Sequence, residues 1–217
     1  MDPHDMDDPI LRYAEDHSTA ESNALKSLRI KTWQTVLSPQ MLSDPLQGSF
    51  LSSMSRMIQP RAVLELGTYT GYSTICLAAG LSADGSIDTV EPNDELNSIQ
   101  DEHWEMAGVK SRINRINSEA LTALPTLPGP YDLIWIDADK IRTPEYVHLC
   151  LERTRIGGWV LVDNVLWWGK VLPEHPDPDP TAIALREMTR DLSTQKSVRT
   201  TLMPMRDGLL MIQKISS

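Results

Sequence analysis

Short apolar runs of strand length alternate along this chain with segments whose apolar residues have helical spacing. The runs lie at 62–66, 86–90, 112–116, 133–136 and 159–162, with two more at 198–203 and 209–215. Strands that alternate with helices predict an α/β fold with a doubly wound, mostly parallel sheet. The last two runs flank Pro204-Met-Arg-Asp-Gly208, a turn sequence, and therefore predict a hairpin that adds one antiparallel strand to a seven-stranded sheet.

The region before Pro60 has apolar residues at helical spacing and predicts helices. We expect residues 1–40 to form an N-terminal helical extension and residues 41–217 to form the main domain. A chain of 217 residues with 41% hydrophobic residues can bury a single core of this size.

Charge and hydropathy argue against two classes of partner. The formal net charge of −10 repels phosphate backbones, so nucleic acid is not an expected partner. The sequence has no apolar run long enough to span a membrane, and the acidic start, residues 1–8, lacks the features of a secretory signal. These features predict a cytoplasmic protein that acts on a small molecule.

Polar or glycine residues follow each of the first five predicted strands. In a doubly wound sheet, ligands bind beyond the carboxyl ends of the strands, where the strand order reverses. The residues at these positions are Glu65-Leu-Gly67-Thr-Tyr69-Thr-Gly71, Glu91, Ser118-Glu119, Asp137-Ala-Asp139-Lys140 and Asp163-Asn164. We therefore expect a functional site along this edge.

The glycine turn after the first strand discriminates between cofactors. Dinucleotide sites favour GxGxxG, whereas this chain has Gly67-x-x-x-Gly71 with Glu65 before it. A carboxylate is unfavourable beside a pyrophosphate but suits the ammonium and sulfonium of S-adenosylmethionine. Glu91, 20 positions after Gly71, is placed to bind ribose hydroxyls. The alternative is that the glycines serve only a strand-to-helix turn.

Asp137, Asp163 and Asn164 offer only hard oxygen ligands, which suit Mg²⁺, Mn²⁺ or Ca²⁺ better than zinc. A divalent cation lowers the pKa of a bound hydroxyl, and Lys140 could take or help to remove its proton. The alternative is that these aspartates cap the following helix or turn.

Three stretches resemble the cation-dependent O-methyltransferases, the group of the caffeoyl-CoA and catechol enzymes and their bacterial relatives. They are Val63-Leu-Glu-Leu-Gly-Thr-Tyr-Thr-Gly-Tyr-Ser73, Ile136-Asp-Ala-Asp-Lys140 and Val162-Asp-Asn-Val-Leu-Trp-Trp-Gly-Lys-Val171. The resemblance implies the Rossmann-like fold of class I methyltransferases. It also implies a homodimer and in-line attack of a metal-held oxygen on the sulfonium methyl.

The resemblance also implies roles for individual residues. The cofactor-binding positions are Glu65, Gly67, Tyr69, Gly71 and Ser73 around the methionine part, Glu91 at the ribose, Ser118 near the adenine, and Asp137 and Asp139. The metal ligands are Asp137, Asp163 and Asn164, and Lys140 matches the general base beside Asp137.

Two tryptophans on the loop after the fifth strand are candidates for substrate contact. Trp167 is expected to form an aromatic wall against a planar substrate. For Trp168, substrate contact and packing against the core or a dimer face stay open.

These observations favour an O-methyltransferase that acts on a catechol-like vicinal hydroxyl of a small hydroxylated aromatic molecule. One alternative is methylation of a hydroxylated tRNA nucleoside, for which Lys110, Arg112 and Arg115 are candidates for a basic patch. Another is a non-catalytic protein that binds S-adenosylmethionine. An NAD-dependent oxidoreductase is disfavoured because GxGxxG is absent.

Overall fold

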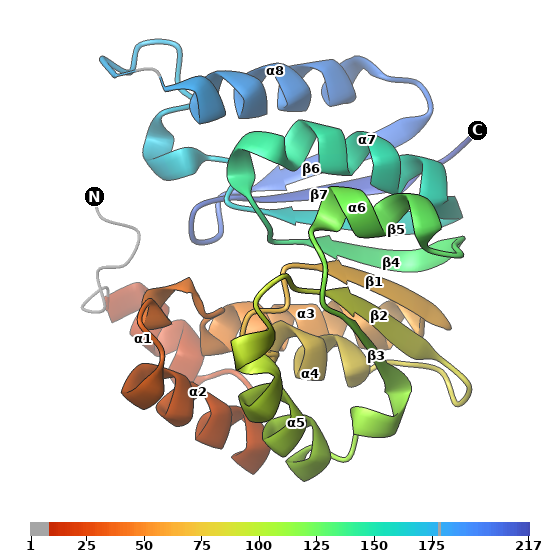
Figure 1. Cartoon of the computed structure of the whole chain (residues 1–217). Coiled ribbons are helices and arrows are strands. Elements are labelled where there is room, and N and C mark those ends of the chain that lie inside the picture. The colour runs from red at the N-terminus through yellow and green to blue at the C-terminus, as the bar shows by residue number, and fades with distance from the viewer. Residues whose placement is uncertain (1–8, 178) are drawn as a thin grey trace. The chain divides into compact units, whose positions relative to one another are not determined.

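The computed structural model describes residues 9–177 and 179–217, so the acidic segment 1–8 lies outside the described residues. The strands form a seven-stranded sheet in the order β3-β2-β1-β4-β5-β7-β6 (Figure 1). Their bounds are Ala62–Leu66 (β1), Ser86–Val90 (β2), Ile113–Ile116 (β3), Tyr131–Ile136 (β4), Thr154–Asp163 (β5), Val198–Met203 (β6) and Leu209–Lys214 (β7).

The pairing of the strands confirms the predicted α/β architecture. Strand β2 is parallel to β3, and β4 is parallel to β5. Strand β7 runs antiparallel to both β5 and β6, so the hairpin adds one reversed strand, as predicted. The strand order reverses between β1 and β4. Ligands of doubly wound sheets bind at such a point.

The helices also follow the predicted alternation. The α-helices are Pro9–Asp16 (α1), Asn23–Thr35 (α2), Pro45–Ile58 (α3), Tyr72–Ala78 (α4), Asn97–Met106 (α5), Ala120–Ala123 (α6), Thr143–Arg153 (α7) and Pro180–Thr194 (α8). Single 3₁₀ turns lie at Pro39–Met41, Asp94–Leu96, Lys110–Arg112, Leu124–Thr126, Lys140–Arg142 and Trp167–Gly169.

The described chain forms two compact units. The N-terminal unit comprises the residues up to 63 together with 68–119, and the C-terminal unit comprises 64–67 together with 120–217. Strand β1 therefore contributes residues to both. The expected division into residues 1–40 and 41–217 stays a prediction.

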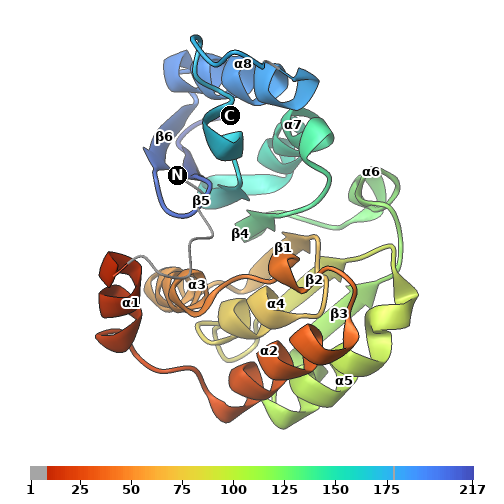
Figure 2. The same ribbon diagram turned by 90° about the vertical axis from the view of Figure 1, so that its left-hand side faces the viewer.

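In the N-terminal unit, helices α3 and α4 approach each other closely. A Cβ on Gly80 would lie 2.1 Å from the backbone carbon of Ser55, so only glycine permits this contact. The Ser55 hydroxyl donates to the carbonyl of Leu77. Helix α2 lies beside α4 and α5, which Figure 2 shows from a second side.

In the C-terminal unit, α7 and α8 lie side by side against strands β4 to β6 (Figure 1). Strand β5 begins at Thr154, directly after α7, and thus earlier than the predicted start at 159. Gly157 and Gly158, which interrupt the apolar pattern, lie inside the strand. Here the register with β4 shifts between Tyr131 and Leu133, as at a β-bulge, where glycine is common.

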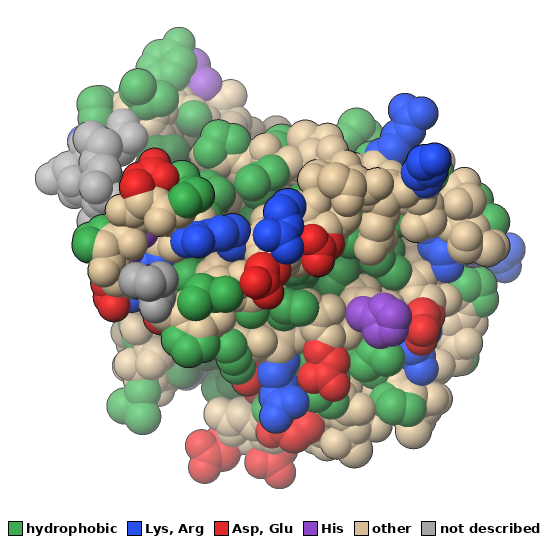
Figure 3. Space-filling model, turned by 90° about the horizontal axis from the view of Figure 1, so that it is seen from above, with side chains coloured by type: hydrophobic (Ala, Val, Ile, Leu, Met, Phe, Trp, Pro, Cys, Tyr) green, Lys and Arg blue, Asp and Glu red, His purple; other side chains and the backbone are tan. Residues whose placement is uncertain are grey.

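Viewed from the side of α8, Lys and Arg side chains are interspersed with Asp and Glu (Figure 3). Over the part of the chain that the structure describes, no helix has both the length and the apolar character needed to cross a bilayer.

Candidate active site

The turn after β1 is confined by the end of β4. Gly67 has a φ of +91°, and a Cβ on it would lie 2.1 Å from the carbonyl oxygen of Asp137. The Asp137 backbone N–H donates to the carbonyl of Leu66 at 2.8 Å. Position 67 thus requires glycine for two reasons: its backbone is left-handed, and Asp137 lies too close for a Cβ.

The rest of the glycine turn lies in the N-terminal unit, where it contacts the end of β2. Tyr69, left-handed at φ +49°, donates its backbone N–H to Glu91 Oε2 at 2.8 Å. The other carboxylate oxygen of Glu91 accepts the backbone N–H of Asn93 at 3.1 Å. Two backbone donors therefore fix the Glu91 carboxylate, and each oxygen keeps a second lone pair for another donor.

Two side chains that the sequence did not single out support this turn from α5. Gln100 donates to the carbonyl of Tyr69 at 2.7 Å, and the Trp104 indole N–H donates to the carbonyl of Gly71 at 3.3 Å. A Cβ on Gly71 would lie 2.5 Å from that indole nitrogen. No sequence pattern indicates these contacts, because α5 meets the turn only in the folded chain.

Three further predicted cofactor residues occupy different environments. Glu65 is completely buried in β1, and Ser73 is buried in the first turn of α4. Ser118 lies two residues after β3 and donates its backbone N–H to the carbonyl of Ile116 at 3.1 Å. Glu65 and Ser118 thus stand near strand ends, as the sequence predicted, whereas Ser73 lies in the helix that follows the glycine turn.

Asp137 and Lys140 are brought together just beyond β4. The Lys140 ammonium donates to Asp137 Oδ1, and both side chains are largely buried. Burial raises the pKa of Asp137 to about 6; Lys140 and Arg206 oppose this shift, and the Asp163 carboxylate adds to it. Asp137 directly follows Ile136 and Asp163 directly follows Val162, and these two residues are paired, so the two acids stand at the ends of neighbouring strands.

Asp163 is the last residue of β5, and Asn164 follows it. Asp163 is only 3% exposed, and its Oδ1 accepts the backbone N–H of Asn164 at 2.9 Å. Asn164 has a φ of +60°, a conformation that asparagine adopts more readily than most residues. Within the described residues, no group of three or more His, Cys, Asp and Glu side chains is arranged to hold a metal ion. The predicted set consists of two carboxylates and an amide.

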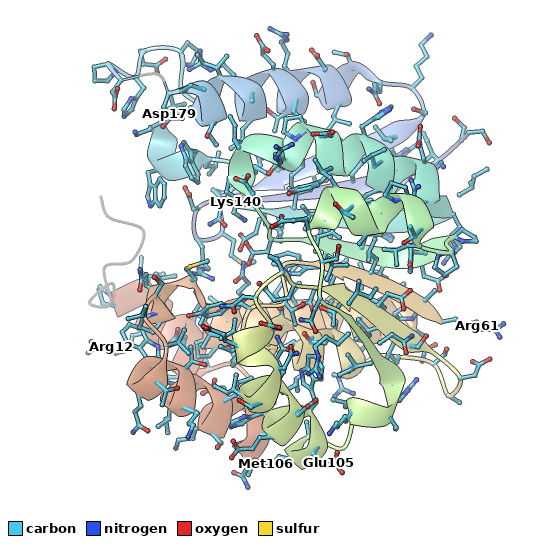
Figure 4. All side chains as sticks on the ribbon, in the orientation of Figure 1. Arg12, Arg61, Glu105, Met106, Lys140 and Asp179 are labelled. Carbon is cyan, nitrogen blue, oxygen red and sulfur yellow. The ribbon has the colours of Figure 1, made fainter. Side chains whose placement is uncertain are left out.

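The exposed Asp139 lies between Asp137 and Lys140, and its carboxylate is 3.9 Å from the Arg142 guanidinium. Figure 4 labels Lys140 beyond the end of β4 and Asp179 at the start of α8.

The loop after β5 has several left-handed residues, which store backbone strain at functional sites. Trp167 and Trp168 have φ values of +48° and +51°, and their rings are 4.5 Å apart between centroids. Trp168 is 50% exposed, so it does not pack into the core. The Trp167 indole N–H donates to Asp179 Oδ2 at 2.9 Å.

The turn between β6 and β7 also contacts this loop. Asp207 Oδ1 accepts the backbone N–H of Trp168 at 2.6 Å. The sequence predicted this segment only as a hairpin turn. The roles of Arg206 and Asp207 beside the candidate site were missed because a turn sequence does not show which loop it contacts.

A model of the O-methyltransferase family matches residues 15–215. The chain belongs to this family. The match begins within residues 1–40, the segment expected to form an N-terminal extension. This O-methyltransferase is 32% identical over 205 residues to the caffeoyl-CoA O-methyltransferase of Stellaria longipes, covering 90% of this chain and 85% of that relative. It is 32% identical over 200 residues to a catechol O-methyltransferase of Niastella koreensis, covering 90% of this chain and 86% of that relative.

A solved structure shows the same fold. The O-methyltransferase TomG from Streptomyces achromogenes, in complex with S-adenosylmethionine, is 29% identical, with a TM-score of 0.86. The likeness covers 95% of this chain and 96% of TomG. The predicted family, enzyme class and Rossmann-like methyltransferase fold are therefore confirmed.

Proposed function

We propose that this enzyme transfers a methyl group from S-adenosylmethionine to one oxygen of a catechol-like pair on a small aromatic molecule, with a divalent cation at the site. One observation carries the proposal: Asp137 and Asp163 stand at the ends of the paired strands β4 and β5, and Lys140 donates to Asp137. Family membership and the named relatives support the reaction class.

The residues near the glycine turn fit S-adenosylmethionine. The Glu91 carboxylate is held by backbone donors with lone pairs left for ribose hydroxyls. Glu65 is a buried acid at the turn, which suits a positively charged ligand. The remaining proposed contacts are Gly67, Tyr69, Gly71, Ser73, Ser118, Asp137 and Asp139.

The donor set fits a hard divalent cation, most favourably Mg²⁺, with Asp137, Asp163 and Asn164 as ligands. The like charges of Asp137 and Asp163 stand at the ends of paired strands, and a bound cation would offset their repulsion. When bound, it would lower the pKa of the acceptor hydroxyl and orient that group.

The side chains of this enzyme would then position the acceptor and handle its proton. Lys140, held against Asp137, is the proposed base: its side chain would first have to lose a proton, and the neutral amine would then take the proton that leaves the hydroxyl. Trp167 is the proposed wall against the aromatic ring of the substrate. By holding the acceptor in place, these side chains would supply much of the rate through proximity.

The alternative tRNA substrate has less support. Arg115 pairs with Asp101 at 2.9 Å, and Lys110 lies 3.8 Å from both Asp101 and Glu105. Arg112 donates to the carbonyls of Ser82 and Gly85. These basic residues are engaged within the N-terminal unit, which leaves a weak basic patch for phosphates.

We also propose a homodimer. Ile30, Trp33 and Leu37 are exposed on α2 and the segment after it, at 44%, 54% and 102%. Large exposed apolar side chains of this kind occur at protein interfaces. Light scattering of the wild type and of W33E measures the oligomeric state. We expect the wild type to be a dimer and W33E to dissociate more readily. A cytoplasmic location stays a prediction.

An acceptor panel tests the reaction. Purified enzyme with S-adenosylmethionine and Mg²⁺ is offered catechols, matched monophenols and hydroxylated tRNA. We expect methylated catechols, and little product from monophenols, which lack the second oxygen. Product from tRNA alone would contradict the proposed acceptor, and product from none of them would contradict the proposed function.

A further inference from the structure

The backbone of the loop that carries Trp167 is fixed by the β6–β7 turn. Besides the bond from Trp168 to the Asp207 side chain, the Leu166 N–H donates to the Asp207 carbonyl at 2.9 Å. The Val165 N–H donates to the carbonyl of Gly208 at 3.1 Å. With its backbone held in this way, the remaining freedom of Trp167 is rotation of its side chain.

Asp179 restricts that rotation. Its Oδ2 accepts the Trp167 indole N–H at 2.9 Å, and Lys170 Nζ lies 3.1 Å from the same oxygen. Its Oδ1 accepts the Ala182 N–H at 2.8 Å and so caps the N-terminus of α8. The two oxygens of one carboxylate therefore perform separate tasks, and the indole is tied to the end of a helix.

The start of α8 is itself anchored to the segment that follows Trp167. The Arg186 guanidinium donates to the carbonyls of Val171, Leu172 and Lys170 at 2.6, 2.9 and 3.3 Å. Asp179 is thus a fixed point rather than a mobile loop residue. A hydrogen bond from a fixed acceptor selects one orientation of the Trp167 ring.

We propose that Asp179 is a positioning residue that sets the plane of the Trp167 indole against the aromatic acceptor, and thereby controls acceptor affinity. The inference rests on the proposed function, because it takes Trp167 as the substrate wall. The Trp167 ring is large, and its contact area with a planar acceptor depends on its angle. Loss of the hydrogen bond leaves the ring present but free to rotate.

The variant D179N separates the two tasks of this side chain. Asparagine caps helices as well as aspartate does, so its oxygen keeps the bond to Ala182. Its amide nitrogen then faces the Trp167 N–H and cannot accept from it. Lys170 loses the same oxygen, so we expect a slightly lower melting temperature. We expect the KM for the catechol acceptor to rise about 3- to 10-fold, the worth of one hydrogen bond, with kcat changed much less.

W167F is the matched control, because it keeps an aromatic ring and removes the indole N–H. In the W167F background, D179N should have little further effect on KM, which makes the two changes strongly non-additive. In ¹⁵N-labelled enzyme, the indole resonance of Trp167, assigned by its loss in W167F, should shift in D179N.

The outcomes separate this inference from the proposed function. If the wild type methylates no catechol, both are contradicted. If the wild type methylates catechols and D179N leaves the acceptor KM unchanged, only the inference is contradicted. The same holds if D179N raises KM equally in the wild-type and W167F backgrounds.

Discussion

At the scale of single residues, Gly67 brings the glycine turn after β1 against the end of β4. A Cβ there would overlap the Asp137 carbonyl at 2.1 Å, so any larger residue must displace the backbone of β1 or β4. Gly108 has a comparable φ of +70° but has no atom within 4 Å of an added Cβ. Alanine substitutions at Gly67 and Gly108 therefore separate two costs to stability. Both place alanine in a left-handed backbone, but only the one at Gly67 adds steric overlap.

We expect G108A to lower the free energy of unfolding by about 1 kcal/mol, the cost of a left-handed alanine. G67A adds the overlap with Asp137, so it should lower the free energy of unfolding by about 3 kcal/mol or more and abolish methyl transfer. Urea unfolding of both variants measures the difference. Equal destabilisation would contradict the close approach.

The site residues that the sequence predicted are those whose position follows from the strand pattern. Glu91 and Asp163 directly follow apolar runs, so the strand pattern alone predicts that each stands at a strand end. Gln100 contacts Tyr69 within one unit and Asp179 contacts Trp167 within the other, and both contacts depend on how helices pack. Spacing along the chain carries no signal for such contacts.

At the scale of elements, the β6–β7 turn holds the loop after β5. Asp207 is 3% exposed, and its side chain accepts the Trp168 N–H. Removal of this acceptor leaves a backbone donor unsatisfied beside three left-handed residues, Asn164, Trp167 and Trp168.

D207A should therefore lower the free energy of unfolding by about 1–3 kcal/mol and reduce kcat/KM. D207N keeps an oxygen acceptor and should recover part of both losses. Urea denaturation and steady-state kinetics on the same preparations test this. Full activity in D207A would show that the loop holds its conformation without the turn.

The segment between α1 and α2 is tied to the start of α4. Glu21 accepts the Tyr72 hydroxyl at 2.8 Å and the Arg29 guanidinium at 2.6 Å. Burial alone would raise the pKa of Glu21, but these two hydrogen bonds lower it below the ordinary value of 4.5. Stabilisation from a lowered pKa is complete above the unfolded value and is lost as the pH falls through the folded value.

E21Q should accordingly lower the free energy of unfolding by about 1–3 kcal/mol at neutral pH. The difference from the wild type should shrink as the pH falls below 4.5. Urea unfolding at several pH values measures it, with the exposed Glu102→Gln as control. A difference that stays constant with pH would contradict the role of the Glu21 charge.

Strands and helices with a regular pattern of apolar residues were predicted well. A strand whose pattern is interrupted by glycines was not. Strand β1 was predicted with its observed bounds, because Ala62–Leu66 is a continuous buried run. Strand β5 was predicted too short, because Gly157 and Gly158 resemble a turn in the sequence while pairing with β4 turns them into a bulge. The pairing that makes this segment a strand is with β4, which lies earlier in the chain.

At the scale of the whole molecule, the strand order explains why residues from separate segments can serve one reaction. The order reverses between β1 and β4, and the acids after β4 and β5 follow neighbouring parallel strands. The sequence predicted this arrangement through alternation alone. It did not identify the acceptor, since side-chain orientations such as that of Trp167 depend on contacts between distant segments.

The central claim is cation-dependent methyl transfer at Asp137, Asp163 and Asn164. The most direct measurement is methyl transfer to a catechol by chelator-treated enzyme, before and after Mg²⁺ is restored, for the wild type and for D163A. We predict that chelation lowers wild-type activity by at least about 100-fold and that Mg²⁺ restores it, whereas D163A stays inactive. Wild-type activity that is unaffected by chelation, or activity retained in D163A, would contradict the account.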